Sequence, residues 1–178
     1  MSDNANIHPA IQPVQLQRLY QVSKVIHSTL DQQEALDLIV REAVGLVGAT
    51  TGSVVLINPS DGFLEIQTAH GLPDGSSRLK LRVGEGITGW VAQQGKPALV
   101  PDVREDARYV PVHDHARSEL AVPLEVNGSV RGVINVDSDQ LNAFSETDQA
   151  LLTELASQAA TVIHNAFLYE RSRIRADL

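Results

Sequence analysis

The hydrophobic pattern of the chain changes its period twice, from helical to alternating and back to helical. Residues 35–47 carry apolar side chains at helical spacing and end near Gly48, a residue type that often terminates helices. A long helix is predicted to begin at 144–148, with Ser145 as N-cap and Asp148 in the capping-box position, and its apolar stripe begins at Leu151. An earlier helix is predicted by a seam with one polar position: Leu16, Leu19, Ser23, Ile26 and Leu30.

Between these helices the pattern is typical of strands joined in hairpins. Residues 53–57 form an apolar run rich in β-branched residues, and a turn of Asn, Pro, Ser, Asp and Gly joins it to a second strand at 63–70. Residues 119–126 and 129–137 flank Asn127-Gly128, a dipeptide that favours tight hairpins. Two shorter strands are predicted at 79–83 and 98–100. Consecutive hairpins indicate an antiparallel sheet of about five or six strands.

The segment 84–117 has a less regular pattern than its surroundings. We expect a short helix within 84–95 and a long irregular crossing over 101–117, with one helical turn in it. Irregular segments of this length are uncommon in compact domains and tend to be functional.

This order of elements predicts an α+β fold with two unlike faces. The N- and C-terminal helices pack on one face of the sheet, and the short helix and long loop cover the other. A face covered in this way is a natural place for a small-molecule cavity. We assign residues 15–170 to this domain, 1–14 to a loose tail, and 171–178 to a helical continuation toward an output domain.

Composition excludes several kinds of chemistry. The 178 residues contain no cysteine, so a thiol nucleophile, disulfide, zinc ribbon or iron–sulfur centre is impossible. With 22 acidic against 14 basic side chains, the net charge of −8 argues against nucleic acid and anionic membranes as partners. No apolar run is long enough to span a bilayer and no signal pattern opens the chain, so we expect a cytoplasmic protein.

Four segments of the sequence carry motifs of one known kind: GATTGSVVLIN at 48–58, VGEGITGWVAQQGKPALVPDV at 83–103, RSELAVPLEVNGSVRGVINVDS at 117–138 and FSETD at 144–148. Together these motifs resemble the GAF domain family, the sensory relatives of the PAS fold. The resemblance extends from about Leu16 to about Tyr169. It implies a regulatory module that binds a ligand or dimerises, upstream of an output domain, as in bacterial two-component-like regulation.

The ligand-specific patterns within that family match this sequence poorly. Cyclic-nucleotide-binding members carry an Asn-Lys pair followed by Phe and an acidic residue. Phe144 and Asp148 match, but Ser138 and Asp139 stand where the pair is expected. Bilin photoreceptors and free-methionine-sulfoxide reductases of this fold use cysteines, which are absent; a bilin held without a covalent bond stays open.

Polar residues in the strands and over the second face are the candidate ligand contacts. In the strand alternation, Glu119 opposes Leu120, and Asn135 and Asp137 oppose Ile134 and Val136. The polar set therefore faces either a cavity or solvent, and Trp90 serves either core packing or a ligand. The candidates are Thr88, Trp90, Tyr109, His113, Glu119, Asn135 and Asp137.

Two further motifs have structural explanations. The GxGxxG motif at 84–89 lies between a strand and a helix, but that helix is too short for a dinucleotide-binding crossover. We therefore expect its glycines to let the backbone turn tightly into that short helix, because glycine tolerates positive φ at little cost. His113 and His115 would share a face of an extended segment and suggest two metal ligands, with His70 elsewhere in the chain and no third ligand evident. A solvated loop is the preferred explanation. We therefore expect no metal and no cofactor.

Three functions fit these observations. The first is a homodimeric sensor in which a small molecule binds the sheet and the C-terminal helix relays the change. The second is a dimerisation spacer without a ligand, with Trp90 and Tyr109 buried together. The third is an enzyme that would use His113, Asp114, Glu119 and Asp137, but these form no catalytic motif, so we expect a protein that is not an enzyme.

Overall fold

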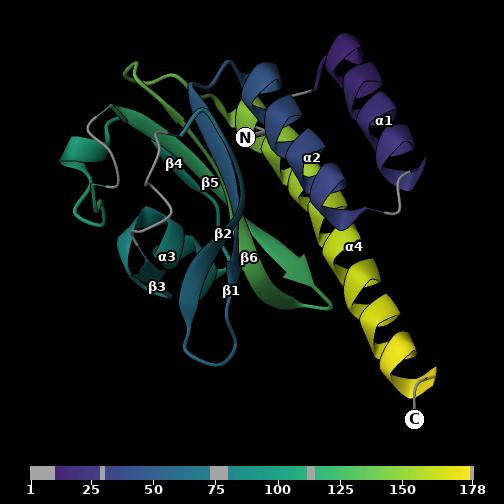
Figure 1. The fold of residues 1–178 in the computed structure, drawn as a ribbon. Helices are drawn as coiled ribbons and strands as arrows, with labels where there is room; N and C mark the ends of the chain where they lie inside the picture. The colour runs from purple at the N-terminus through teal and green to yellow at the C-terminus, as the bar shows by residue number, and fades with distance from the viewer. Residues whose placement is uncertain (1–10, 29–30, 73–79, 112–114, 177–178) are drawn as a thin grey trace, which may run out of the picture.

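A single antiparallel sheet organises the molecule, with helices on both sides (Figure 1). The computed structural model describes residues 11–28, 31–72, 80–111 and 115–176. Its six strands have the order β3-β2-β1-β6-β5-β4. They are β1 (Thr51–Ile57), β2 (Phe63–His70), β3 (Leu81–Arg82), β4 (Ala98–Val100), β5 (Ser118–Val126) and β6 (Ser129–Ser138). The predicted α+β fold is confirmed.

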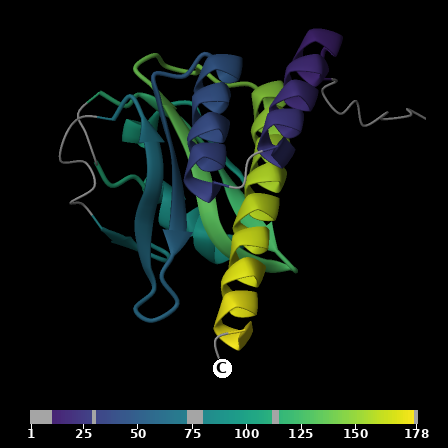
Figure 2. The same cartoon turned by 45° about the vertical axis from the view of Figure 1, so that its right-hand side comes forward.

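Three helices cover one face of this sheet, as Figures 1 and 2 show. α2 (Gln32–Val47) and α4 (Glu146–Ala176) pack on the strands, and α1 (Pro13–Ser28) lies outside them. The far face carries α3 (Gly86–Gln94), a 3-10 turn (Val103–Glu105) and the connecting loops. None of the helices over the described residues is long and apolar enough to cross a membrane.

Local signals in the sequence set the ends of the helices. The Asp31 side chain accepts hydrogen bonds from Gln33 N and Glu34 N at the start of α2. Gly48 ends that helix at a φ of 66°, which glycine adopts cheaply. At the start of α4, Ser145 Oγ accepts from Asp148 N at 3.2 Å and Asp148 Oδ2 accepts from Ser145 N at 2.8 Å. The predicted capping box is therefore confirmed.

The two predicted hairpins are present, and the predicted short strand is shorter than expected. Asn127 and Gly128 both have positive φ, at 52° and 77°, as a tight two-residue turn requires. The strand expected at 79–83 comprises Leu81 and Arg82, and Leu79 lies outside the described residues. It pairs with β2 at the edge of the sheet through two residues, because the chain turns at once into α3.

The first helix differs from its predicted seam. Its buried side chains are Leu19, Val22 and Ile26, so Val22 occupies the place expected for Ser23. Leu16, at the start of the seam, is 52% exposed. Positions 22 and 23 both lie at helical spacing from Leu19 and Ile26. Because that side of α1 faces α2 and α4, the apolar Val22 is the residue that is buried there.

Each face of the sheet has its own apolar core. Leu36, Ile39, Leu120, Ile134 and Leu155 belong to the core under the helices. The second core lies under α3 and consists of Val55, Leu64, Ile87, Val91, Ala92, Ala98, Val100, Val103, Ala116, Ala121 and Val133. Alternate residues of β5 and β6 therefore serve different layers, as the strand alternation predicted.

Two glycines provide a matched test of this packing. A Cβ on Gly132 in β6 would lie 2.1 Å from the Val55 carbonyl oxygen, whereas one on Gly45 in α2 meets nothing closer than 3.6 Å. We expect Gly132→Ala to lower the free energy of unfolding by about 1 to 3 kcal/mol. Gly45→Ala should raise it by about 0.5 to 1 kcal/mol, because alanine is the better helix residue. Urea denaturation measures both, and equal effects would contradict the described contact between β6 and β1.

Candidate functional site

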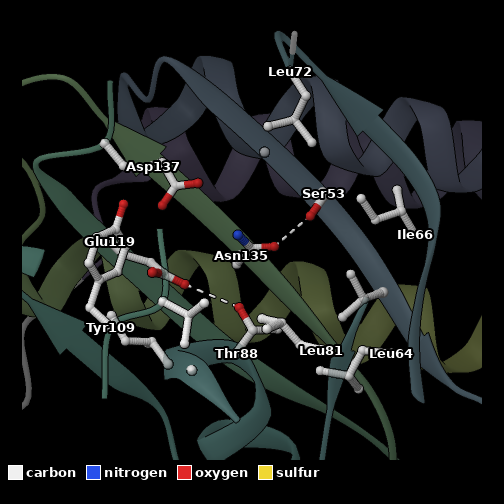
Figure 3. Close-up of a pocket in the computed structure, with 16 residues that line it drawn as sticks. Ser53, Leu64, Ile66, Leu72, Leu81, Thr88, Tyr109, Glu119, Asn135 and Asp137 are labelled. Carbon is white, nitrogen blue, oxygen red and sulfur yellow. Dashed lines mark hydrogen bonds between the residues drawn. The ribbon is translucent and has the colours of Figure 1, made fainter. Parts of the chain in front are cut away.

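A cavity lies between the far face of the sheet and the segment 84–117 (Figure 3). Its volume is about 80 Å³. The floor comes from β1, β5 and β6, and the cover from α3 and the loop that follows the 3-10 turn. The described lining is Gly52, Ser53, Val55, Leu64, Ile66, Leu72, Leu81, Gly86, Ile87, Thr88, Tyr109, Val110, Ala116, Glu119, Asn135 and Asp137.

Strand register places a row of polar side chains across this floor. Thr51 in β1 pairs with Asp137 in β6, and Asp137 pairs with Glu119 in β5. Thr51 Oγ1 donates a hydrogen bond to Asp137 Oδ2 at 3.3 Å. All three residues are less than a tenth exposed. Because residues paired across adjacent strands point to the same side, the two carboxyl groups face one cavity.

A second row runs parallel to the first, two residues along each strand. Ser53 pairs with Asn135, and Asn135 pairs with Ala121. Ser53 Oγ donates to Asn135 Oδ1 at 2.6 Å, which orients the amide nitrogen of Asn135 away from that bond (Figure 3). The cavity floor therefore offers amide, hydroxyl and carboxyl groups in fixed positions.

Glu119 is the most buried ionisable group of the site. Its Oε1 accepts a hydrogen bond from Thr88 Oγ1 of α3 at 3.2 Å, which joins the floor to the cover (Figure 3). Burial raises the pKa of this carboxyl well above its ordinary value, and the Asp137 carboxylate raises it further. The bond from Thr88 opposes that rise in the pKa. The Glu119 carboxyl therefore stays protonated up to a higher pH than an exposed glutamate does.

The glycine-rich entry into α3 closes one side of the cavity. Gly84 and Gly86 have φ values of 93° and 69°, which other residues rarely adopt. A Cβ on Gly89 would lie 2.5 Å from the Arg82 carbonyl oxygen. All three glycines of the GxGxxG motif are therefore required by backbone geometry, which agrees with the structural explanation of that motif.

A compact turn at residues 106–109 holds Tyr109 against the cavity. Asp106 accepts bonds from Arg108 Nε at 2.9 Å and from its terminal nitrogen at 2.6 Å. The Arg108 guanidinium stacks over the Trp90 ring, 4.4 Å from its centroid. The hydrogen bonds from the Arg108 side chain hold the pKa of the Asp106 carboxyl below its ordinary value. Arg108 thus ties the loop to α3, and Tyr109, one residue on, lines the cavity.

Five of the six predicted ligand contacts that the structure describes line the cavity. Thr88, Tyr109, Glu119, Asn135 and Asp137 all line the cavity. Trp90 packs partly buried against the far-face core and Arg108 and is not among the described lining residues, so its contact with a ligand stays a prediction.

The histidine motif is only partly described. His113 and Asp114 lie outside the described residues, and so does the predicted contact of His113 with a ligand. His115 lines a neighbouring cavity of about 170 Å³, which shares Ala116 and Asp137 with the first. Within the described ranges, no three His, Asp or Glu side chains are grouped to hold a metal ion.

Several contributors to the site were not predicted from the sequence. Ser53 contributes to the β1 part of the floor, and Ile66, Leu81 and Ile87 contribute part of an apolar wall. Thr51 lines the neighbouring cavity and donates to Asp137, which lines both. A signal was present for β1, since Thr51, Ser53 and Val55 alternate with Gly52 and Val54. Their neighbours in β6 are more than 80 residues away in sequence, so the pattern alone does not pair them.

Comparison with known proteins identifies the family. The family model described as "GAF domain" matches residues 29–164, which is most of the chain and includes every described residue of the cavity. This chain belongs to the GAF domain family. The resemblance found in the sequence motifs is thereby confirmed.

Regulatory proteins are among the relatives of this GAF domain. The Nif-specific regulatory protein of Azospirillum lipoferum is 30% identical over 132 residues, which are 70% of this chain and 21% of that protein. The chain therefore spans about a fifth of the length of this relative. The GAF domain of an Acinetobacter phosphoenolpyruvate-protein phosphotransferase is 25% identical with a TM-score of 0.80, covering 89% of this chain and 97% of that one.

One structural neighbour of this GAF domain is an enzyme. The free methionine-R-sulfoxide reductase of Neisseria meningitidis, solved with its substrate, has a TM-score of 0.77 at 23% identity. The match covers 87% of this chain and 93% of that one, and identity at this level shows the fold alone. This chain contains no cysteine, so thiol chemistry at the shared fold is impossible here.

The burial of Glu119 makes a prediction about stability and pH. A raised folded-state pKa means that its contribution to stability is fully present below the ordinary glutamate pKa of 4.5 and is lost as the pH rises through the folded pKa. We expect Glu119→Gln to raise the melting temperature at pH 8 by at least about 2 °C, roughly 1 kcal/mol for a chain of this size. The gain should shrink as the pH falls toward 4.5.

The matched control for this substitution is Glu125→Gln, on the exposed part of the same strand. It should leave the melting temperature within about 1 °C of the parent at each pH. A loss of stability in Glu119→Gln at pH 8 would show that the ionised carboxylate is stabilised by the fold, contrary to the described burial.

Proposed function

We propose that this GAF domain is the sensory module of a regulatory protein, binding a small molecule in the far-face cavity and relaying its presence through α4. The observation that carries the proposal is the cavity itself: polar groups fixed on the floor by strand register, an apolar wall, and a cover tied down by Arg108. The regulatory relative in sequence supports the same role. We propose binding without catalysis, in the cytoplasm, with no resident cofactor or metal.

The cover and the relay helix share the same sheet. α3 contacts β5 and β6 on the far face, while α4 packs on β5 and β6 from the opposite face. Leu120 and Ile134 lie under the helices, one residue from Glu119 and Asn135 in the cavity. A ligand that shifts these strands therefore acts on the surface against which α4 packs.

A dimer through the terminal helices is the second part of the proposal. α4 extends beyond the edge of the sheet, as Figure 1 shows. Its last turns expose Leu168, Tyr169 and Ile174, and α1 exposes Leu16 and Tyr20 at helical spacing. Apolar side chains on two neighbouring helices suit a partner helix from a second copy. In such a dimer, a bound ligand would change the register between the two paired α4 helices. That change would then be transmitted to an output domain.

Ligand binding is tested by filling the cavity. Ala116 is buried and lines it, so we expect Ala116→Leu to remove most of the available volume. Wild-type protein should gain several degrees in melting temperature with at least one member of a metabolite panel, and Ala116→Leu should gain none. The control is Ala107→Leu, an exposed position in the same cover segment, which should behave as wild type.

A ligand-free spacer makes the opposite prediction for the same experiment. No compound would then stabilise the wild type, and Ala116→Leu would be as stable as its parent or more so. That result would contradict sensing but leave the dimer proposal standing.

The dimer is tested by placing a charge on α4. We expect Leu168→Glu, at a position 49% exposed, to weaken self-association at least about tenfold, because a buried carboxylate at a helix interface is costly. Leu141→Glu, at a loop position 50% exposed, is the matched control and should leave association unchanged. Sedimentation equilibrium measures both, and a wild-type monomer at all concentrations would contradict the proposal.

A further inference from the structure

The amide of Asn135 lies where the polar part of the cavity floor meets the apolar part. Ser53 and Asn135 are partners across β1 and β6. Val55, two residues beyond Ser53, pairs with Ile66 in β2 and with Val133 in β6. Rows two residues apart along a strand are separated by roughly 7 Å. A short hydrocarbon chain therefore reaches from the Asn135 amide to the row of Val55.

Ser53 determines which end of the Asn135 amide faces the cavity. The bond from Ser53 Oγ to Asn135 Oδ1, at 2.6 Å, occupies the oxygen end, and the nitrogen points away from it (Figure 3). That nitrogen carries two N–H donors. Across the described ranges of the chain, no group accepts a hydrogen bond from it. Because Asn135 lines the cavity, the floor presents a neutral donor there.

A fixed amide donor favours a ligand that brings a neutral acceptor. Asn135 is half-buried, and a donor withdrawn from water costs free energy unless an acceptor satisfies it. A carbonyl oxygen accepts through two lone pairs. An ionised ligand group would need a charged partner at this point, because burying an unpaired charge costs far more than burying a carbonyl. Since the group that faces the ligand here is an amide, a neutral carbonyl is the better match.

The apolar lining describes the rest of the ligand. Val55, Leu64, Ile66, Leu81 and Ile87 form an apolar wall on the side of the cavity beyond Asn135. Hydrocarbon placed against this wall is stabilised in proportion to the apolar area that it removes from water. A cavity of about 80 Å³ has room for only a few carbon atoms. The ligand is therefore short, with its polar atom at one point and its hydrocarbon part on one side of it.

We propose that the cavity selects a small neutral carbonyl compound, whose oxygen accepts a hydrogen bond from Asn135 Nδ2 and whose hydrocarbon chain lies on the apolar wall. This inference rests on the proposed sensory function and deepens it by naming the ligand class. In so small a space, a compound bonded to Asn135 also touches the neighbouring row of Glu119 and Asp137.

Three probes of similar size separate the carbonyl oxygen from shape and from charge. Butan-2-one carries the oxygen, 2-methylbut-1-ene has the same shape with a CH₂ group in its place, and sodium butyrate carries an ionised carboxylate. Each is added to the full chain at constant ionic strength. NMR follows the side-chain amide protons of Asn135 and the methyl groups of Ile87. The resonances that disappear in Asn135→Leu identify the amide protons.

We expect butan-2-one to shift the Ile87 methyl groups and to move the Asn135 amide protons downfield, because these protons gain an acceptor. The alkene should shift the Ile87 methyl groups without a downfield shift of the amide protons. Butyrate at the same concentration should shift neither. The ligand class would be overturned if butan-2-one fails to bind, if it shifts the methyl groups alone, or if butyrate binds in its place.

Two variants locate the hydrogen bond. Asn135→Leu keeps the approximate shape of the side chain without its donor, and it should weaken butan-2-one binding about three- to tenfold without weakening the alkene. Ser53→Ala frees the amide to rotate and should weaken butan-2-one by a smaller factor. Asn165→Leu, at an exposed position of α4, is the matched control and should bind both probes as wild type does. Equal losses for ketone and alkene in Asn135→Leu, or no loss for the ketone in either cavity variant, would overturn the inference.

The metabolite panel separates this inference from the sensory function. A carbonyl compound that stabilises the wild type, but neither Asn135→Leu nor Ala116→Leu, supports both proposals. If only compounds without a neutral carbonyl stabilise the wild type and not Ala116→Leu, the domain is a sensor and the carbonyl inference is wrong. If no compound stabilises the wild type, sensing itself fails.

Discussion

The register of three strands, β1, β6 and β5, is the constraint on which the site depends. It brings Thr51, Asp137 and Glu119 into one row although they come from segments far apart in sequence. The same register turns Leu120 and Ile134 toward the helices. A slip of one residue would exchange the two sets, placing carboxyl groups in the core and leucine in the cavity. The same strand register therefore determines both the packing of the core and the positions of the polar groups in the site.

The two faces of the sheet are covered by different kinds of structure. Under the helices, fully buried aliphatic residues such as Leu36, Leu152 and Leu155 form a close-packed layer. On the far face, the cover is a nine-residue helix and an irregular segment. Its positions are held by individual contacts, of which Thr88 with Glu119 and Arg108 with Trp90 are the clearest. Fewer contacts make this layer the easier one for a small molecule to rearrange.

Turns, helix ends and the alternation of strand residues could be predicted from the sequence, because each depends on residues close together in the chain. Asn127-Gly128 predicted a hairpin, Ser145 with Asp148 predicted a helix start, and strand alternation predicted which side Glu119 and Asn135 face. What could not be predicted depends on long-range pairing. The bond from Ser53 to Asn135 spans 82 residues, and no local signal indicates it. The stacking of Arg108 on Trp90 likewise depends on how a loop returns over α3.

The central claim is that the space between the polar floor and the segment 84–117 receives a small molecule. The most direct measurement is a high-resolution crystal structure of protein purified from cells without denaturation. The account predicts non-protein electron density in contact with Glu119 or Asp137. A cavity closed by the protein's own side chains, with no such density in independent crystal forms, would contradict it.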